Sequence, residues 1–144
     1  MTELPNSLPS LSPILSVRGG AQAVDFYKGA FGAKALFRVD APDGAVVAQL
    51  SIGRSDFWVA DESPAHSNFS PETLGGGTVR MSLVVDDPDV VFAQAIAAGA
   101  KMVQPMVNED YGWRLGRVVD PFGHHWEIGK PLAEISKPLA LKNE

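Results

Sequence analysis

The stretch VVDDPDVVFAQAIAAGAK, residues 84–101, carries the signals of a strand, a helix and a second strand, in that order. Its helix is marked at both ends: Asp87 is a typical N-cap residue, Pro88 suits the first helical position and Gly99 suits the C-terminal stop. Between these ends, apolar residues recur at helical spacing, namely Val91, Phe92, Ala95 and Ile96. A β-rich run at residues 79–85 precedes the helix. The stretch therefore predicts a helix flanked by strands.

A second copy of this pattern lies earlier in the chain. Gly32-Ala33-Lys34 recurs as Gly99-Ala100-Lys101, 67 residues later. Three further pairs are 68 residues apart: Val17 and Val85, Gly44 and Gly112, and Trp58 and Trp126. A one-residue difference inside the first helix reconciles the two spacings. Several pairs with nearly the same spacing, in the same order, indicate two copies of one structural unit.

Each copy is predicted to contain one strand, one helix and three further strands. In the first copy the strands are residues 14–17, 35–40, 45–52 and 56–61, and the helix is residues 21–31. In the second copy the strands are residues 79–85, 101–107, 113–119 and 124–128. Pro105 lacks a backbone N–H, so residues 101–107 are expected to form an edge strand. The fold class is therefore α+β, with two tandem βαβββ units.

The whole chain, 1–144, is expected to form one domain in which a linker joins the two units. The first unit spans about residues 12–61, the linker 62–77, the second unit about 78–129 and the tail 130–144. The linker is rich in Ser, Pro and Gly, and it is expected to contain no regular element. The first dozen residues and the tail are expected to be extensions, either mobile or docked on a partner.

Composition excludes several classes of function. A chain of 144 residues with 45% hydrophobic and 20% charged residues can bury a substantial core without disulfides. The absence of cysteine excludes thiol nucleophiles, iron–sulfur clusters and zinc ribbons. A net charge of -5 without a Lys/Arg cluster predicts no nucleic-acid partner, since phosphate neutralisation supplies most of that affinity. With no signal peptide and no apolar run of bilayer length, we expect a cytoplasmic protein without a membrane partner.

Five motifs occur in order along residues 13–129. They are Ala23-Val24-Asp25-Phe26-Tyr27 through Phe31-Gly32-Ala33; Ser70-Pro71-Glu72-Thr73-Leu74-Gly75-Gly76; Val85-Asp86-Asp87 with Ala98-Gly99-Ala100; Tyr111-Gly112 with Arg114; and Asp120-Pro121-Phe122-Gly123-His124-His125-Trp126-Glu127-Ile128. In this order, and with the internal repeat, the chain resembles the glyoxalase/bleomycin-resistance/dioxygenase superfamily, also called vicinal oxygen chelate proteins. The resemblance implies a curled mixed sheet around a pocket, half of the sheet coming from each unit. The family includes lyases, isomerases, ring-cleaving dioxygenases, thiol transferases and drug-sequestering proteins without catalysis, so the fold alone leaves the function open.

Metal-dependent members of that family take one ligand, usually His, Glu or Gln, from the first and the last strand of each unit. The resemblance places these positions at Ser12, Val59, Arg80 and Glu127. Val59 cannot ligate a metal and Arg80 brings a positive charge, whereas a working site needs about three protein ligands. We therefore expect no metal and no cofactor. A one-residue shift of the alignment would bring His124 or His125 beside Glu127, but it would leave the first copy without ligands.

Alternation along the strands predicts which side chains face the pocket. The predicted lining is Ser12, Gln49, Phe57, Val59, Arg80, Ser82, Arg117, His125 and Glu127. Trp58 and Trp126 are expected to face the helices, in the core. We expect Arg80 to stand in place of the cation and to pair with Glu127, so that Arg80→Ala destabilises the fold by a few kcal/mol. In an alternative that stays open, Arg80, Arg117 and Glu127 only satisfy one another's charges.

A lining of apolar walls with a few polar groups suits a small-molecule ligand. The sequence therefore predicts a protein that binds a small molecule in a metal-free pocket, of the resistance or sequestration type. One alternative is a superfamily enzyme, a lyase, isomerase or dioxygenase, with a divergent site. Another is an interaction module whose pocket is vestigial. We also expect a homodimer, because proteins of this type usually pair their curled sheets.

Overall fold

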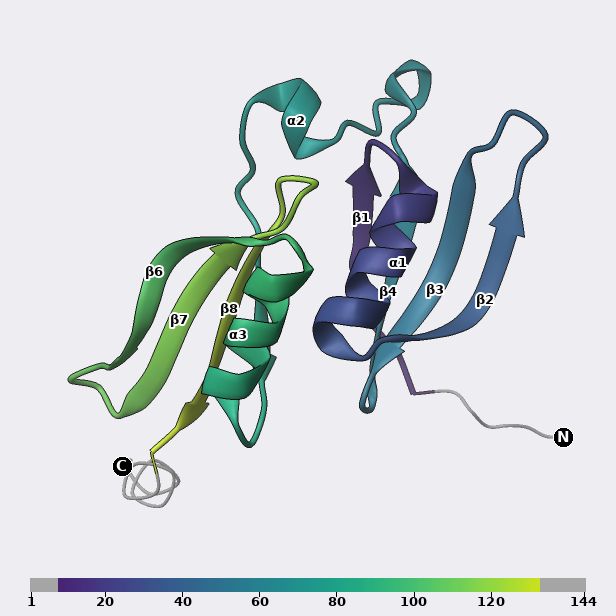
Figure 1. Ribbon diagram of the computed structural model, residues 1–144. Coiled ribbons are helices and arrows are strands. Elements are labelled where there is room, and N and C mark those ends of the chain that lie inside the picture. The colour runs from purple at the N-terminus through teal and green to yellow at the C-terminus, as the bar shows by residue number, and fades with distance from the viewer. Residues whose placement is uncertain (1–7, 133–144) are drawn as a thin grey trace, which may run out of the picture.

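The computed structural model describes residues 8–132, which form two β-α-β-β-β units joined by a linker (Figure 1). The first unit consists of β1 (Ile14–Val17), α1 (Gly20–Phe31), β2 (Lys34–Asp40), β3 (Val46–Ile52) and β4 (Ser55–Asp61). The second consists of β5 (Arg80–Val84), α3 (Pro88–Ala98), β6 (Lys101–Asn108), β7 (Trp113–Val119) and β8 (His125–Pro131). Most of the predicted extensions, residues 1–7 and 133–144, lie outside the described residues.

Each unit contributes a separate four-stranded mixed sheet. The strand orders are β1-β4-β3-β2 and β5-β8-β7-β6; the pairs β1–β4 and β5–β8 are parallel, and the other pairs are antiparallel. Pro105 lies in β6, an edge strand, as predicted. The tandem βαβββ fold is confirmed, and the two sheets are not closed on one another (Figure 1).

The helix boundaries follow from the residues that cap them. In α3 the Asp87 side chain accepts a hydrogen bond from the Val90 backbone N–H (3.4 Å), as expected of an N-cap. Helix α1 begins at Gly20, one residue before the predicted start. Asp61 of β4 stabilises this end by accepting hydrogen bonds from the backbone N–H groups of Gly19 (3.1 Å) and Gly20 (3.0 Å). A Cβ atom at position 20 would lie 2.5 Å from the Asp61 carboxylate, so this contact requires glycine.

The linker contains two short elements, the 3-10 helix η1 (Pro64–His66) and the helix α2 (Pro71–Leu74). Ser70 caps α2 by accepting a hydrogen bond from the Thr73 backbone N–H (3.2 Å). Glu62 accepts hydrogen bonds from the Ser70 backbone N–H (2.8 Å) and the Thr73 hydroxyl (2.8 Å). These hydrogen bonds lower the pKa of Glu62 to about 2, and the one from the Ser70 N–H contributes most. The prediction of a linker without regular elements is wrong. The Glu62 side chain, which lies outside α2, stabilises the first turn of that helix.

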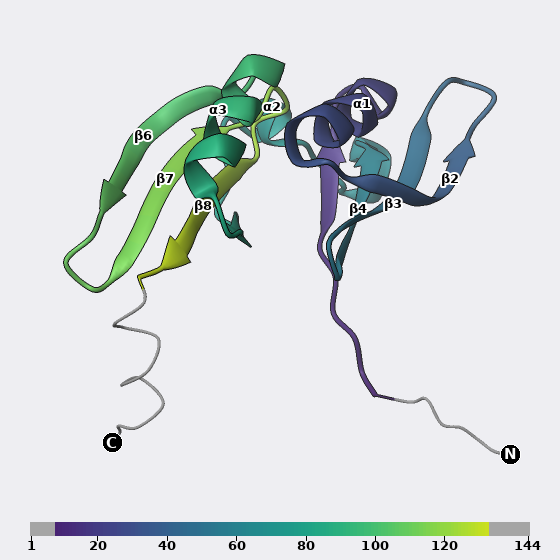
Figure 2. The same cartoon turned by 60° about the horizontal axis from the view of Figure 1, so that its bottom comes forward.

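One hydrophobic core joins the two units on the faces of the sheets that α1 and α3 cover (Figure 2). Its centre is a cluster of aromatic rings: Tyr27, Phe31, Phe57, Phe122 and Trp126. The Tyr27 hydroxyl and Trp126 Nε1 (2.9 Å) both donate to the buried carboxylate of Asp120. Burial, and then the charge of Asp120, raise the pKa of Tyr27 well above its usual value. Since Tyr27 belongs to the first unit and Asp120 to the second, this contact ties the units together.

The helices leave the other face of each sheet open (Figures 1 and 2). In the first unit this open face carries a group of exposed apolar side chains: the strand register brings Ile14, Phe37, Val39 and Val47 to the same side as Trp58. In the second unit it carries charged side chains. None of the helices within residues 8–132 is long and apolar enough to cross a membrane.

Candidate functional site

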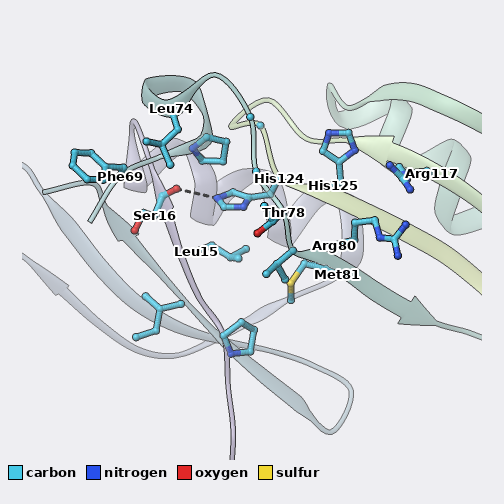
Figure 3. Close-up of a pocket in the computed structure, with 17 residues that line it drawn as sticks. Leu15, Ser16, Phe69, Leu74, Thr78, Arg80, Met81, Arg117, His124 and His125 are labelled. Atoms are coloured by element: carbon cyan, nitrogen blue, oxygen red, sulfur yellow. Dashed lines mark hydrogen bonds between the residues drawn. The ribbon is translucent and has the colours of Figure 1, made fainter. Parts of the chain in front are cut away.

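A cavity of about 660 Å³ lies between the first strands of the two units, β1 and β5, beneath the linker. Its apolar walls include Leu15 of β1, Met81 of β5, and Phe69 and Leu74 of the linker. Polar side chains gather at the other end, where Arg80, Arg117 and His125 lie together (Figure 3). The cavity thus has an apolar end under the linker and a basic end on the open face of the second sheet.

Strand register places the charged groups of the second unit on one face. Arg80 of β5 is opposite His125 of β8, and Glu127 of β8 lies between Ser82 of β5 and Arg117 of β7. Glu127 Oε2 is 3.3 Å from Arg80 Nη1 and 3.2 Å from Arg117 Nη2. The predicted ion pair of Arg80 and Glu127 is therefore present. A single carboxylate serves two guanidinium groups, which leaves one positive charge uncompensated within this cluster.

The three charged side chains differ in exposure. Arg117 and Glu127 keep 21% and 24% of their side-chain surface, whereas Arg80 keeps 55%. Two nitrogen atoms of the basic end, Arg117 Nε and His125 Nδ1, are buried without a hydrogen-bond partner in the described part of the chain. The donors that a bound molecule could reach at this end of the cavity are therefore the remaining N–H groups of the Arg80 and Arg117 guanidinium groups.

His124 connects the two units at the wall of the cavity. Its Nε2 atom lies 2.9 Å from the backbone carbonyl oxygen of Ser16 in β1, and Figure 3 shows this contact as a dashed line. Its backbone N–H donates to Asp120 Oδ1 (3.0 Å), the carboxylate that also binds Tyr27. The imidazole is therefore fixed between β1 and the turn before β8 rather than free in solvent.

Two residues of the predicted lining lie in the core instead. Phe57 and Val59 are 3% and 0% exposed in the core, and the Phe57 ring lies 5.4 Å from that of Tyr27, on the helix side of the sheet. Trp58, expected in the core, faces the open side, where its ring lies 6.0 Å from that of Phe37. Trp126 is in the core, as expected.

The sequence assigns the side chains of β4 to the wrong faces of the sheet, and the strand register shows why. Leu15 of β1 pairs with Val59, and Leu83 of β5 pairs with Ile128, so Val59 corresponds to Ile128. The last strands of the two units are thus offset by 69 residues rather than 68, and Trp58 is the counterpart of Glu127. An offset of one residue in a strand moves every side chain to the other face.

The remaining predicted residues are distributed over both units. Gln49 lies on the open face of the first unit, where its amide donates to Asp56 (3.1 Å). Ser82 lies on the open face of the second unit, and Ser12 precedes β1; neither lines the cavity. Sequence reasoning missed the linker residues Phe69 and Leu74, whose only signal is that they are large apolar residues in an otherwise polar segment.

The corrected set of metal positions still does not fit a divalent cation. Trp58 offers no ligand atom in place of Val59, and the guanidinium of Arg80 occupies the space beside the carboxylate of Glu127. Within residues 8–132, no three His, Asp or Glu side chains come together in a group that could hold a metal ion. The donor chemistry of this site is that of an ion-pair cluster rather than a metal centre.

Comparison with known proteins agrees with this fold. An uncharacterized protein of Mycobacterium tuberculosis (strain ATCC 25618 / H37Rv) is 41% identical over 135 residues, which cover 91% of this chain and 79% of that protein. The crystal structure of TioX from Micromonospora sp. ML1 has a TM-score of 0.65 at 28% identity, covering 87% of this chain and 98% of that one. The fosfomycin resistance protein FosX of Listeria monocytogenes shares the fold alone: the TM-score is 0.68 at 13% identity, covering 92% of this chain and 98% of that one.

A family model described as the Glyoxalase/Bleomycin resistance protein/Dioxygenase superfamily matches residues 11–128. The match extends from just before β1 into β8, and so it includes both units and the linker between them. This chain therefore belongs to the glyoxalase/bleomycin resistance protein/dioxygenase superfamily.

Proposed function

We propose that this protein binds a small organic molecule in the cavity between β1 and β5, and that it does so without a metal ion. The observation that carries the proposal is the cluster of Arg80, Arg117 and Glu127 at the basic end of the cavity. A guanidinium beside the carboxylate supplies a fixed positive charge where metal-dependent relatives would hold a cation. The site keeps a positive centre without metal ligands.

The shape and lining of the cavity support the same proposal. Its volume of about 660 Å³ is within the range of sites for small ligands. The apolar walls of Leu15, Phe69 and Leu74 would supply affinity by burial, and the polar groups at the other end would fix orientation. The linker is held in place by Glu62, so the wall that it provides is already formed.

The second candidate is an enzyme of the superfamily. His125 favours it, because its ring lines the cavity next to Arg80. An imidazole in that setting can exchange a proton with a bound ligand. Glu127 is less suited to this task, since its Oε2 atom is engaged by two guanidinium groups.

Metal analysis separates the two candidates. Purified protein is incubated with Ni²⁺, Zn²⁺, Mn²⁺ or Fe²⁺, desalted and analysed for metal content, alongside Glu127→Gln. Metal-free binding predicts far less than one ion per chain for both proteins. One ion per chain in the wild type, lost in Glu127→Gln, would overturn the proposal in favour of a metal-dependent enzyme. A thermal-shift screen of small molecules on the same samples, in EDTA, tests binding itself.

We further propose a homodimer in which a second copy covers the open face of the first unit. The exposed side chains of Phe37, Val39 and Val47 form an apolar surface on one face of the sheet. Exposed apolar surfaces of this kind mark interaction sites in soluble proteins, and a second copy is the partner that a two-fold contact provides.

A further inference from the structure

We infer that the ligand of this cavity is an organic monoanion, a carboxylate carried on an apolar body, and that Arg117 and Arg80 bind the carboxylate. This inference rests on the proposed small-molecule binding and adds the chemical class of the ligand. It follows from the charges, the accessible guanidinium donors and the apolar end of the cavity.

The charges at the cavity do not balance. Among the described residues that line the cavity, two are arginines and none is acidic. The neighbouring Glu127 neutralises one of the two guanidinium charges, because its Oε2 atom lies 3.3 Å from Arg80 and 3.2 Å from Arg117. One positive charge remains at the wall of a partly closed cavity, where it attracts an anion more strongly than it would in bulk water. A single excess charge matches a monoanion.

The two arginines carry hydrogen-bond donors that Glu127 does not engage. An arginine has five N–H donors, and Glu127 accepts a hydrogen bond from only Nη2 of Arg117. Arg80 keeps 55% of its side-chain surface and Arg117 keeps 21%, so both guanidinium groups remain accessible at this end of the cavity. A carboxylate offers two oxygen atoms to the planar edge of a guanidinium, a pairing stronger than a hydrogen bond between neutral groups. The ligand would thus satisfy donors that the protein leaves unused.

The opposite end of the cavity is apolar. Leu15, Phe69 and Leu74 line the cavity on the side of β1 and the linker, away from Arg117 and His125 (Figure 3). A carboxylate alone would leave these walls in contact with water. An apolar body attached to the carboxylate would cover them, and burial of that body would supply most of the affinity.

The test compares acids with their neutral amides on the full-length protein. The probes are phenylacetate, 4-phenylbutyrate and 1-naphthoxyacetate, each with the corresponding amide, and phenylphosphonate as a dianion, measured by titration calorimetry in EDTA. We expect each acid to bind about tenfold or more tightly than its amide, because the amide loses the charge-assisted hydrogen bonds.

Variants then locate the anion site. Arg117→Gln and Arg80→Gln should reduce the preference for acid over amide, whereas Arg54→Gln, an exposed arginine in the turn between β3 and β4, should leave it unchanged. Glu127→Gln should bind the acids more tightly than the wild type does, because it removes the competing carboxylate. A merely destabilised variant would lose acid and amide binding together, so this gain separates the anion site from a loss of fold.

The outcomes are distinct. Equal affinity for acids and amides would overturn the monoanion inference while leaving small-molecule binding in place. Phenylphosphonate binding more tightly than the carboxylates would overturn the assignment of a single charge. Failure of every acid and amide to bind would count against the proposed function itself.

Discussion

At the scale of single residues, the unequal exposure of Arg80 and Arg117 decides how much each contributes to stability. Arg80 is 55% exposed and Arg117 is 21% exposed, and both contact the same oxygen atom of Glu127. The expectation that Arg80→Ala costs a few kcal/mol assumed a buried pair in which Glu127 had no other partner. The structure revises it, because water reaches Arg80 and Arg117 remains beside the carboxylate.

We therefore predict that Arg80→Ala lowers the free energy of unfolding by about 1 kcal/mol or less, as exposed ion pairs do. Arg117→Ala should cost about 2 kcal/mol, since it removes the less exposed, hydrogen-bonded partner. Urea unfolding of both variants, of Glu127→Gln and of the Arg80→Ala/Glu127→Gln double mutant measures the coupling between Arg80 and Glu127 directly. A loss above about 3 kcal/mol for Arg80→Ala would mean that Glu127 depends on Arg80 alone.

Tyr27 is the residue on which the contact between the units depends. Tyr27→Phe leaves the ring in the core but removes the hydroxyl that donates to Asp120, so we expect a loss of about 1–3 kcal/mol. Tyr111→Phe is the matched control, since Tyr111 is exposed and should change stability by less than about 0.5 kcal/mol. Equal effects of the two substitutions in urea unfolding would show that the buried hydroxyl contributes nothing.

The same tyrosine predicts a dependence on alkaline pH. Its pKa in the folded protein is raised above the ordinary value of 10.0, by burial first and then by Asp120. The folded state therefore holds the proton more firmly than the unfolded state. The stability from Tyr27 is present below pH 10 and is lost as pH rises above it, a loss that Tyr27→Phe should not show.

At the scale of elements, we predict that the ionised carboxylate of Glu62 stabilises the folded linker. Its pKa of about 2 in the folded protein is below the ordinary value of 4.5, owing to hydrogen bonds from Ser70 and Thr73. The stability that it provides is present above pH 4.5 and is lost as pH falls toward 2. Glu62→Gln should be less stable than the wild type at pH 7, and the difference should narrow over this range.

The control for this experiment is Glu72→Gln, an exposed carboxylate in α2 itself. Thermal unfolding from pH 7 to pH 2 compares the three proteins. If Glu62→Gln and Glu72→Gln follow the same curve, the carboxylate of Glu62 does not hold the linker.

Local signals account for the elements that the sequence predicts well. Asp87, Pro88 and Gly99 act within a few residues, and so the boundaries of α3 could be read directly. The caps that were missed are distant in sequence: Asp61 binds the first turn of α1 from the end of β4, and Glu62 binds the first turn of α2 from the other side of η1. No local pattern encodes such contacts.

The sequence predicts only part of the cavity lining, for a related reason. Alternation gives the period of a strand but not its phase, and in the sequence the phase of β4 depends on the pairing of Trp58 with Trp126. That pair is not structurally equivalent, so Phe57 and Val59 were assigned to the pocket although they lie in the core. The phase of β5, β7 and β8 was correct, and Arg80, Arg117 and His125 do line the cavity.

At the scale of the whole molecule, the two sheets share a core on their helix-covered faces and remain open on the others. We predict that the wild-type protein sediments as a dimer at micromolar concentration, with the open face of the first unit covered. Val47→Glu should shift it toward monomer, because a charge would be buried on that face. Val90→Glu, at an exposed position of α3, should remain dimeric.

Sedimentation velocity distinguishes these results. A monomeric wild type across the micromolar range would refute the homodimer. If the wild type, Val47→Glu and Val90→Glu form dimers of equal stability, Val47 does not lie in the interface.

The central claim is that the cavity between β1 and β5 binds a small molecule with the Arg80–Arg117–Glu127 cluster in place of a metal centre. The most direct measurement is the affinity of the tightest-binding screened ligand, determined by calorimetry in EDTA and again with saturating Mn²⁺ or Zn²⁺. The account predicts the same affinity in both, and a weaker one for Arg117→Gln. Binding that occurs only with the metal ion, and that Glu127→Gln abolishes, would contradict it.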